Sequence, residues 1–422
     1  MNATVVLFGT FALLCLIRVP IAVSLGVASL IALHLVDFTL YTVIQKMFSA
    51  LNSATLMAIP GFVFAGAIMS KGGLSNHLIS ALRAWVGHMR GGVAVVTVLA
   101  CMIFAAISGS SPATAAAIGA IMIPAMVESG YSKRYAMGLV AASGTLGILI
   151  PPSIPLIIYG SVAEESVGKL FSAGIIPGLV LGGILLVSAV IYARIKNFGG
   201  LPRESMQERW RKTGKAIWGF LLPVIILGGI YSGAVTPTEA SIVAGAYGFL
   251  VSVLVYREMT WKGFLEVLRE SINITAMIFL IIASATVFGM FLTTEQVPQD
   301  FAQWIESSTS NKWLFILGVN IMFFILGMFL ESVAIILITL PILLPVLALF
   351  HINVIQFAII MTMNMEFAMI TPPVGLNLFV VSGIAREKIG EVVKGVVPFY
   401  GLMLIALVLV IVFPGLSLTL AK

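Results

Sequence analysis

Two polar stretches interrupt otherwise apolar sequence in the first half of this chain. One is residues 108–112, Ser-Gly-Ser-Ser-Pro, and the other runs from Ser143 to the pair Pro151-Pro152. Proline lacks an amide hydrogen and clashes with the preceding turn, so paired prolines within an apolar helix free carbonyls that need a partner. A sodium ion is one such partner. The hydroxyls that could complete an oxygen cage around it are those of Ser108, Ser110, Ser111, Ser143 and Thr145.

A half-helix that begins after Pro112 would offer something else, because free amides and the positive end of a helix dipole attract an anion. Small residues also let membrane helices pack closely, and for any single serine here that interpretation is the better one. The two interruptions taken together, and their recurrence in the second half, favour an ion site.

The second half contains comparable interruptions at residues 330–332, 364–366 and 371–375. Their oxygen donors, with those just beyond, are the side chains of Ser332, Thr362, Asn364, Thr371, Asn377 and Ser382. Glu331 and Glu366 are the only carboxylates placed near the membrane interior, where ionisable groups are functional candidates by default. For Glu331 three roles stay open: cation ligand, proton carrier, or a polar tip that reaches outer water.

The amino-acid composition indicates whether these sites lie in water or in a membrane. Of the 422 residues, 60% are hydrophobic and 9% charged, whereas roughly 25% are charged in an ordinary soluble domain. Apolar runs of about 17 to 25 residues recur along the chain, each long enough to cross roughly 30 Å of hydrocarbon. We therefore predict an all-α integral membrane protein whose first apolar segment is a retained helix rather than a signal peptide.

Other protein classes find little support. The net charge of +6 resides in short loops between apolar segments, which is typical of orientation signals and not of nucleic-acid binding. Cys15 and Cys101 lie in apolar stretches, and the four histidines lack ligand spacing. No nucleophile, base and orienting group converge, and no phosphate-binding glycine loop is present, so we expect neither an enzyme nor an ATP-driven pump.

The positions of prolines and glycines predict two structural repeats. Five of these residues recur 221 positions later, namely Pro124, Pro151, Pro152, Gly174 and Pro177, which are answered by Pro345, Pro372, Pro373, Gly395 and Pro398. We divide the chain into a first repeat (1–194), a hydrophilic cytoplasmic linker (195–215) and a second repeat (216–422). Each repeat contains a hairpin and then a broken helix, at about 91–128 and 135–165 in the first and about 313–349 and 353–383 in the second.

The distribution of charge predicts that the repeats have opposite topology. One side can hold all of the 23 Lys and Arg residues except Lys46, Lys169, Lys312 and Lys422, if both hairpins are re-entrant. The loops that contain residues 164–165 and 295–306 are acidic and fall on the other side. The result is ten spanning segments with both termini outside. Segments 38–54 and 258–270 are predicted to be amphipathic helices on the membrane surface.

Four motifs give the chain a resemblance to a known family. In order they are 108–114 (SGSSPAT), 150–155 (IPPSIP), 236–240 (TPTEA) and 371–375 (TPPVG). Together they resemble the large membrane subunit of tripartite ATP-independent periplasmic (TRAP) transporters, within the wider ion transporter superfamily. The likeness covers essentially the whole chain.

The resemblance implies an elevator-type, sodium-driven permease of the bacterial inner membrane that carries small organic acids. It also implies a small four-helix membrane subunit and a periplasmic substrate-binding protein as partners. The alternatives left open are a self-sufficient symporter of the same superfamily, and a channel or membrane-embedded enzyme.

The resemblance also implies positions for the sites. The residues expected at a first sodium site are Ser108, Gly109, Ser110, Ser143, Gly144, Gly147 and Ile150. Those expected at a second are Glu331, Ser332, Thr362, Asn364 and Thr371. Substrate is expected at Ser111, Ser153, Ser332 and Asn377, and the helix breaks at Pro151, Pro152, Pro372 and Pro373.

Overall fold

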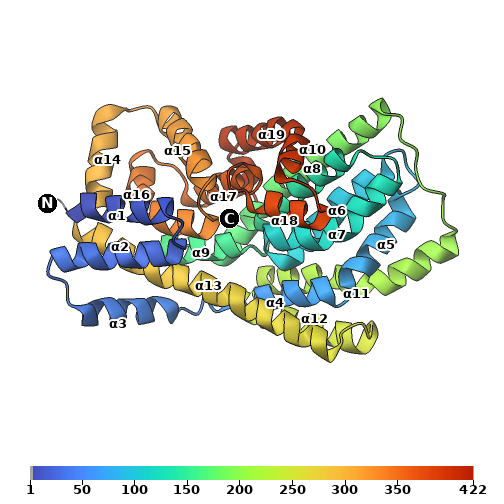
Figure 1. Cartoon of the computed structure of the whole chain (residues 1–422), viewed down its shortest axis with the longest axis horizontal. Coiled ribbons are helices and arrows are strands. Elements are labelled where there is room, and N and C mark those ends of the chain that lie inside the picture. The colour runs from blue at the N-terminus through green and yellow to red at the C-terminus, as the bar shows by residue number, and fades with distance from the viewer. Residues whose placement is uncertain (1–2, 422) are drawn as a thin grey trace.

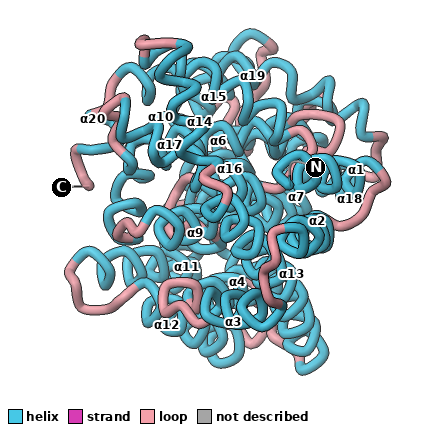
Figure 2. The backbone as a smooth tube through the Cα atoms, turned by 90° about the vertical axis from the view of Figure 1, so that its left-hand side faces the viewer, coloured by secondary structure: helices cyan, strands magenta, loops and turns pink. Residues whose placement is uncertain are grey.

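The computed structural model describes residues 3–421, and every regular element within that range is a helix (Figures 1 and 2). The first half contains α1 (Ala3–Leu16), α2 (Ile21–Leu35), α3 (Leu40–Leu51), α4 (Ala58–Lys71), α5 (Leu74–Val86), α6 (Gly92–Ser108), α7 (Ser111–Glu128), α8 (Lys133–Gly144), the 3₁₀ turn η1 (Thr145–Ile148), α9 (Ile154–Ala163) and α10 (Val167–Ile195).

The second half contains α11 (Met206–Tyr231), α12 (Pro237–Leu250), the π-helical turn η2 (Val251–Val255), α13 (Trp261–Thr294), α14 (Val297–Ser308), α15 (Lys312–Gly327), α16 (Ser332–Leu349), α17 (Val354–Ile370), α18 (Leu376–Ala385), α19 (Ile389–Val412) and α20 (Gly415–Leu418).

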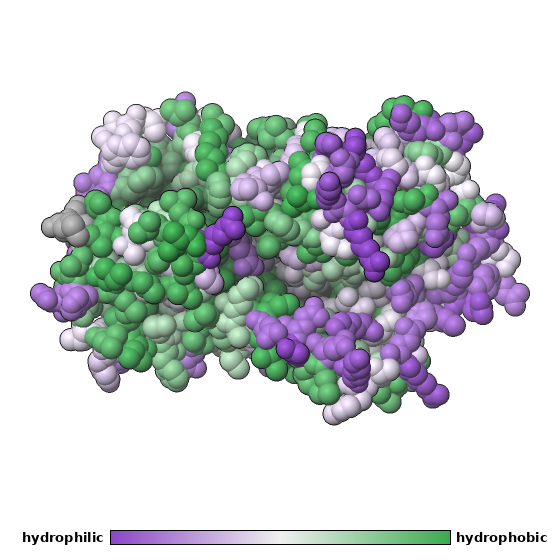
Figure 3. All heavy atoms as spheres, viewed as in Figure 1, coloured by the Kyte–Doolittle hydropathy of each residue, from purple (hydrophilic) through white to green (hydrophobic). Residues whose placement is uncertain are grey.

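Seven of the described helices are long and apolar enough to cross a membrane: α7, α10, α11, α12 together with η2, α13, α16 and α19. Shorter apolar helices accompany them, including the arms of the interrupted pairs. Hydrophilic residues gather toward the end of the molecule that carries α5 and the start of α11, while apolar residues cover much of the opposite part of the same face (Figure 3). The expectation of an all-helical, multi-pass membrane protein is confirmed.

Each half contains two adjacent helix interruptions. Residues 109–110, called tip 1 below, separate α6 from α7, and residues 328–331, tip 2, separate α15 from α16. Residues 149–153, break 1, separate η1 from α9, and residues 371–375, break 2, separate α17 from α18. Both Pro-Pro peptide bonds are cis. Gly109 and Gly375 have φ of 61° and 52°, in the left-handed region that glycine enters without steric cost.

Most helix contacts fall within two groups, which meet where α6 packs on α4 and α5 and where α16 packs on α13. In one group α4 packs on α12, α2 on α13, and α5 on α11. In the other, α7 packs on α8 and α18, α15 on α17, and α16 on α9. Figure 1 shows the first group along one side of the molecule, with α4, α11, α12 and α13 together, and the interrupted helices along the other side. All four interruptions therefore belong to a single body of helices.

One expected surface helix is part of a longer element. Residues 258–270 were predicted to form a separate amphipathic helix, but α13 runs unbroken from Trp261 to Thr294. The reason is local, because α13 contains no proline and no glycine lies between positions 264 and 288. Its charged beginning is docked rather than free, since Lys71 Nζ lies 3.3 Å from Glu266 and 3.5 Å from Glu270.

Two segments predicted to be non-helical contain helices. The second half of the hydrophilic linker, residues 206–215, forms the first turns of α11, where the Ser205 hydroxyl caps the Glu208 amide. The acidic segment 295–306 contains most of α14, which has Pro298 in its first turn. Proline is well tolerated there because the amide it lacks has no intrahelical partner. Both helices are amphipathic, and the charged residues of their polar faces made these segments resemble loops in the sequence.

The predicted orientation can be tested at Gln207 and Gln299, which are both exposed and lie on α11 and α14 near opposite ends of the molecule in Figure 1. In a background with Cys15 and Cys101 replaced by alanine, we expect Gln299→Cys to react with an impermeant thiol reagent added outside intact cells. Gln207→Cys should react only after the cells are permeabilised. The reverse pattern of labelling would refute the assigned orientation.

Candidate functional site

Tip 1 is in direct contact with break 1. The Gly109 carbonyl accepts a hydrogen bond from the Ile154 amide at 3.3 Å, so the hairpin is bonded to the first residue of α9. A Cβ atom built on Gly109 would lie 2.9 Å from the Pro152 carbonyl oxygen. The two interruptions that the sequence places 40 residues apart therefore form one structural unit, called the first site below.

The first site is rich in oxygen atoms. The hydroxyls of Ser108 and Thr114 lie 2.8 Å apart, and Thr114 donates to the Ser110 carbonyl at 2.9 Å. Ser143 is fully buried, and its hydroxyl has no hydrogen-bond partner among the described residues. Buried hydroxyls are normally hydrogen-bonded. An unpaired one beside a broken helix is available as a ligand for a hard cation, which prefers oxygen donors.

Glycine is required where η1 approaches the hairpin. A Cβ atom on Gly147 would lie 2.5 Å from the Ser110 carbonyl oxygen and 2.7 Å from Thr114 Oγ1, and one on Gly144 would lie 2.8 Å from Ala115 Cβ. These glycines bring the backbone of the broken helix against the start of α7. Ile150 packs behind break 1, where its side chain lies against Gly178 of α10.

Tip 2 is bonded to break 2 in a similar way. The Val374 amide donates to the Met328 carbonyl at 3.2 Å, and a Cβ atom on Gly327 would lie 2.3 Å from Ala368 Cβ. On the other side of break 2, the Tyr400 hydroxyl of α19 donates to the Ile370 carbonyl at 2.7 Å. Partners in tip 2 and on α19 thus satisfy backbone groups next to the interruption. These residues form the second site together with Thr362 and Asn364.

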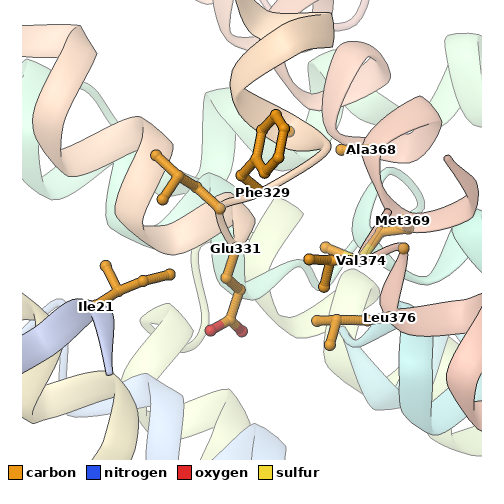
Figure 4. A pocket seen from close by; sticks show the side chains of 10 residues that line it. Ile21, Phe329, Glu331, Ala368, Met369, Val374 and Leu376 are labelled. Carbon is orange, nitrogen blue, oxygen red and sulfur yellow. The ribbon is translucent and has the colours of Figure 1, made fainter. Parts of the chain in front are cut away.

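Glu331 lines a cavity that none of the other expected ligands of the second site lines. Its carboxylate extends into a cavity of about 180 Å³ between Ile21 of α2 and Leu376 of α18 (Figure 4). Asn364 and Thr371 line a different and larger cavity of about 790 Å³, between α15, α17 and α19. Of the five residues expected at one sodium site, Glu331 therefore lines one cavity, while Asn364 and Thr371 line another.

Three expected ligands of the second site share one hydrogen-bond pattern. Thr362, Asn364 and Thr371 each donate to the carbonyl four residues earlier, at 2.8, 2.9 and 2.6 Å. Their side-chain hydrogens thus bond to their own helix while an oxygen keeps lone pairs for another partner. Glu366 is also buried, and its Oε1 atom has no hydrogen-bond partner among the described residues.

Two residues expected to bind substrate contact each other across the halves of the chain. Asn377 Nδ2 donates to Ser111 Oγ at 2.8 Å and to the Ala141 carbonyl at 3.0 Å, and Ser111 Oγ lies 3.1 Å from Asn377 Oδ1. Both residues are fully buried. Ser111 is the first residue of α7 and Asn377 the second of α18, so the positive ends of two half-helices meet here.

The other two expected substrate residues are placed differently. The Ser153 hydroxyl accepts from the Leu156 amide at 3.4 Å and donates to the Ile148 carbonyl, so it caps α9 and closes break 1. Ser332 is buried at the first position of α16. Helices α7, α9, α16 and α18 carry no Lys or Arg, so helix N-termini and hydroxyl or amide groups are the donors they offer an anion.

Sequence reasoning missed three polar residues of these sites: Thr114, Asn320 and Tyr400. In the sequence, Thr114 could have been found from its position four residues after Ser110. Asn320 could have been found as a side-chain amide inside an apolar helix. No sequence pattern near Tyr400 predicts its role, because Tyr400 and Ile370 lie on different helices and meet only in the folded protein. Among residues 3–421 no group of three or more His, Cys, Asp and Glu could hold a metal ion.

Comparisons with known proteins identify relatives along nearly the whole chain. Residues 8–416 match the family model described as "Tripartite ATP-independent periplasmic transporter, DctM component". The C4-dicarboxylate TRAP transporter large permease protein DctM of Pseudomonas aeruginosa is 49% identical over 375 residues, which cover 89% of this chain and 88% of that protein. The sialic acid TRAP transporter large permease protein SiaM of Vibrio cholerae is 35% identical, with coverage of 96% and 95%.

A further relative is longer than this chain. The isethionate TRAP transporter permease protein DctMQ of Oleidesulfovibrio alaskensis is 41% identical over 415 residues, which cover 98% of this chain and 65% of that protein. Among solved structures, the YdaH transporter of Alcanivorax borkumensis has a similar fold, with a TM-score of 0.64, 15% identity and coverage of 98% of both chains.

The close approach at Gly147 leads to a prediction. Gly147→Ala should force tip 1 away from η1 and cost about 1 to 3 kcal/mol of stability through overpacking, with loss of transport in whole cells. Gly183→Ala on α10 is the matched control, because nothing lies within 4 Å of a Cβ atom there. Thermal unfolding of the purified proteins and uptake by cells would be compared. Normal behaviour of Gly147→Ala would show that tip 1 and η1 do not depend on this contact.

Proposed function

The chain belongs to the DctM component family of tripartite ATP-independent periplasmic transporters, and from that premise we propose that it imports a small organic carboxylate by coupling to sodium. It is a large permease subunit, hence a transport protein and not an enzyme. The proposal places it in the bacterial inner membrane. The single observation that carries the coupling is that a hairpin tip is bonded to a Pro-Pro break in each half of the chain.

Anion binding is proposed where the halves meet, at the buried pair Ser111 and Asn377. The N-termini of α7 and α18 supply positive potential without a basic side chain, as at many anion sites. The absence of a basic side chain suits a carrier, because a permanent charge in the membrane interior is unfavourable when the site is empty. Relatives named for C4-dicarboxylate and sialic acid support a carboxylate as the class of substrate.

Sodium binding is proposed at the first and second sites, one on each side of that pair. The buried Ser143 hydroxyl at the first site, and the free lone pairs of Thr362, Asn364 and Thr371 at the second, are the oxygen donors that support it. A cation next to a half-helix N-terminus also neutralises the substrate anion. Binding of each ion then favours binding of the other, which is the basis of symport.

An elevator movement is proposed because the interrupted helices form one body and α1–α5 with α11–α13 form another. Sliding one body against the other would carry the sites across the membrane without unwinding further backbone. Two repeats of opposite topology are part of this proposal, which the distribution of Lys and Arg and the 221-residue offset of the repeated prolines support. With inverted repeats, the inward-facing and outward-facing states can be formed by exchanging the conformations of the two repeats.

Partners are proposed from the family. The word tripartite in its name, and the relative DctMQ that extends well beyond the region matching this chain, support a small membrane subunit and a periplasmic binding protein. Without the binding protein the permease would have no delivered substrate.

The partner requirement can be tested in reconstituted vesicles. With a sodium gradient, this chain alone should show negligible uptake of radiolabelled dicarboxylate, sialic acid, sugar acid or keto acid. Addition of the small subunit and the binding protein encoded beside it should restore uptake of one class. Concentrative uptake by this chain alone would instead identify a self-sufficient symporter. Uptake that shows no counterflow would indicate a channel.

The contribution of Ser143 can be tested by Ser143→Ala. Removal of one hydroxyl ligand should cost about 1 to 3 kcal/mol, or roughly five- to 150-fold in sodium affinity, while the protein stays folded. The measurement is the sodium concentration for half-maximal uptake. Ser129→Ala is the control, because that hydroxyl bonds to Ala125 of its own helix at the far end of α7. An unchanged sodium requirement in Ser143→Ala would remove Ser143 from the first site.

A further inference from the structure

Asn320 and Asn364 form a hydrogen-bonded chain between two helices of the second site. Asn320 Nδ2, on hairpin arm α15, donates to the Ile316 carbonyl at 2.6 Å. Asn364 Nδ2, on α17, donates to Asn320 Oδ1 at 2.6 Å and to the Ile360 carbonyl at 2.9 Å. Two side-chain amides thus lie between two backbone carbonyls, within helices that are otherwise almost entirely apolar.

The two carbonyls fix the direction of this chain. A backbone carbonyl accepts hydrogen bonds and cannot donate, so Asn320 must turn its NH₂ group to Ile316 and its oxygen to Asn364. Asn364 must then turn its NH₂ group to Asn320, and the Ile360 carbonyl takes the second hydrogen of that group. Rotation of the Asn364 amide by 180° would set acceptor against acceptor at Asn320 and Ile360. Rotation of the Asn320 amide would set acceptor against acceptor at Ile316 and donor against donor at Asn364. Both donor positions of Asn364 are consequently used.

The oxygen of Asn364 remains available. Within residues 3–421 no donor to Asn364 Oδ1 accompanies the two bonds made by its nitrogen. Asn320, Asn364, Thr371 and Pro372 line the same cavity of about 790 Å³. The amide pair therefore lies beside break 2, whose residues Thr371 and Pro372 line the same cavity.

Ser143, the residue of the first half that corresponds to Asn364, needs no second residue to orient its side chain. Asn364 stands 221 residues after Ser143, the offset of the repeated prolines, and the Ser143 hydroxyl has no partner among the described residues. A hydroxyl presents lone pairs whichever way its hydrogen turns. An amide presents either an acceptor or two donors, and the donors would repel a cation.

We propose that Asn320 is a positioning residue of the second site, which holds the Asn364 amide with its oxygen toward the cation. This inference rests on the proposed sodium coupling and adds a residue that acts without touching the ion. Outer residues that orient a metal ligand typically contribute about ten- to 100-fold in affinity. The interaction between hairpin arm and broken helix thereby becomes part of the cation site.

The test uses purified full-length protein and measures its thermal stabilisation by sodium chloride, with potassium chloride as the ionic-strength control. Asn320→Leu should raise the sodium concentration for half-maximal stabilisation roughly ten- to 100-fold, and Asn320→Ala should do the same if the leucine variant folds poorly. Ser188→Ala on α10, which removes a hydroxyl bonded to Leu185 of its own helix, should leave that concentration unchanged.

A double-mutant cycle separates positioning from a general effect on folding. If Asn320 acts through Asn364, then Asn320→Leu should change the sodium response of an Asn364→Ala protein less than twofold. Equal effects of Asn320→Leu in both backgrounds, or a normal sodium response of Asn320→Leu alone, would refute the inference and leave the sodium coupling standing. If the wild-type protein itself responded equally to sodium and potassium, the proposed coupling would be wrong and this inference would go with it.

Discussion

A broken helix inside a membrane has to find partners for the backbone groups that the break exposes, since lipid offers none. In this protein the partners are other interruptions. The Gly109 carbonyl bonds to Ile154 and the Met328 carbonyl to Val374, so each hairpin tip is bonded to the Pro-Pro break that follows it in sequence. This constraint holds each hairpin against the broken helix of its own half, and contacts of α7 with α18 and of α9 with α16 join the two halves.

The same constraint explains the chemistry of the sites. Where the chain cannot satisfy its own carbonyls with amides, hydroxyls and small residues fill the space, and their oxygen atoms suit a cation. Where half-helices begin, amides and dipoles suit an anion. The proposed cation and anion sites thus share one region, in which α7, α9, α16 and α18 contain no Lys or Arg. Backbone geometry provides much of what basic and acidic side chains provide in soluble binding proteins.

The sequence predicted features that depend on local chemistry. The all-helical membrane class follows from composition, and the interruptions coincide with prolines and glycines whose conformational limits act within one turn. Features that depend on distant contacts had no such signal. Ser111 and Asn377 are 266 residues apart, and nothing in either motif indicates that their side chains are bonded. The polar beginning of α11 and the amphipathic helix α14 resemble loops in charge, while Asn320 was missed because it lies within a long apolar segment.

The length of α13 has a consequence for the membrane around the protein. Its 34 residues extend about 51 Å at 1.5 Å per residue, whereas the hydrocarbon layer is roughly 30 Å thick. Even at a tilt of about 40°, near the upper end for membrane helices, the axis would rise by about 39 Å along the bilayer normal. Some of this helix therefore projects beyond the hydrocarbon at any ordinary angle. A thicker or thinner bilayer changes only how much projects, so the protein can tolerate hydrophobic mismatch without the bilayer having to deform around α13.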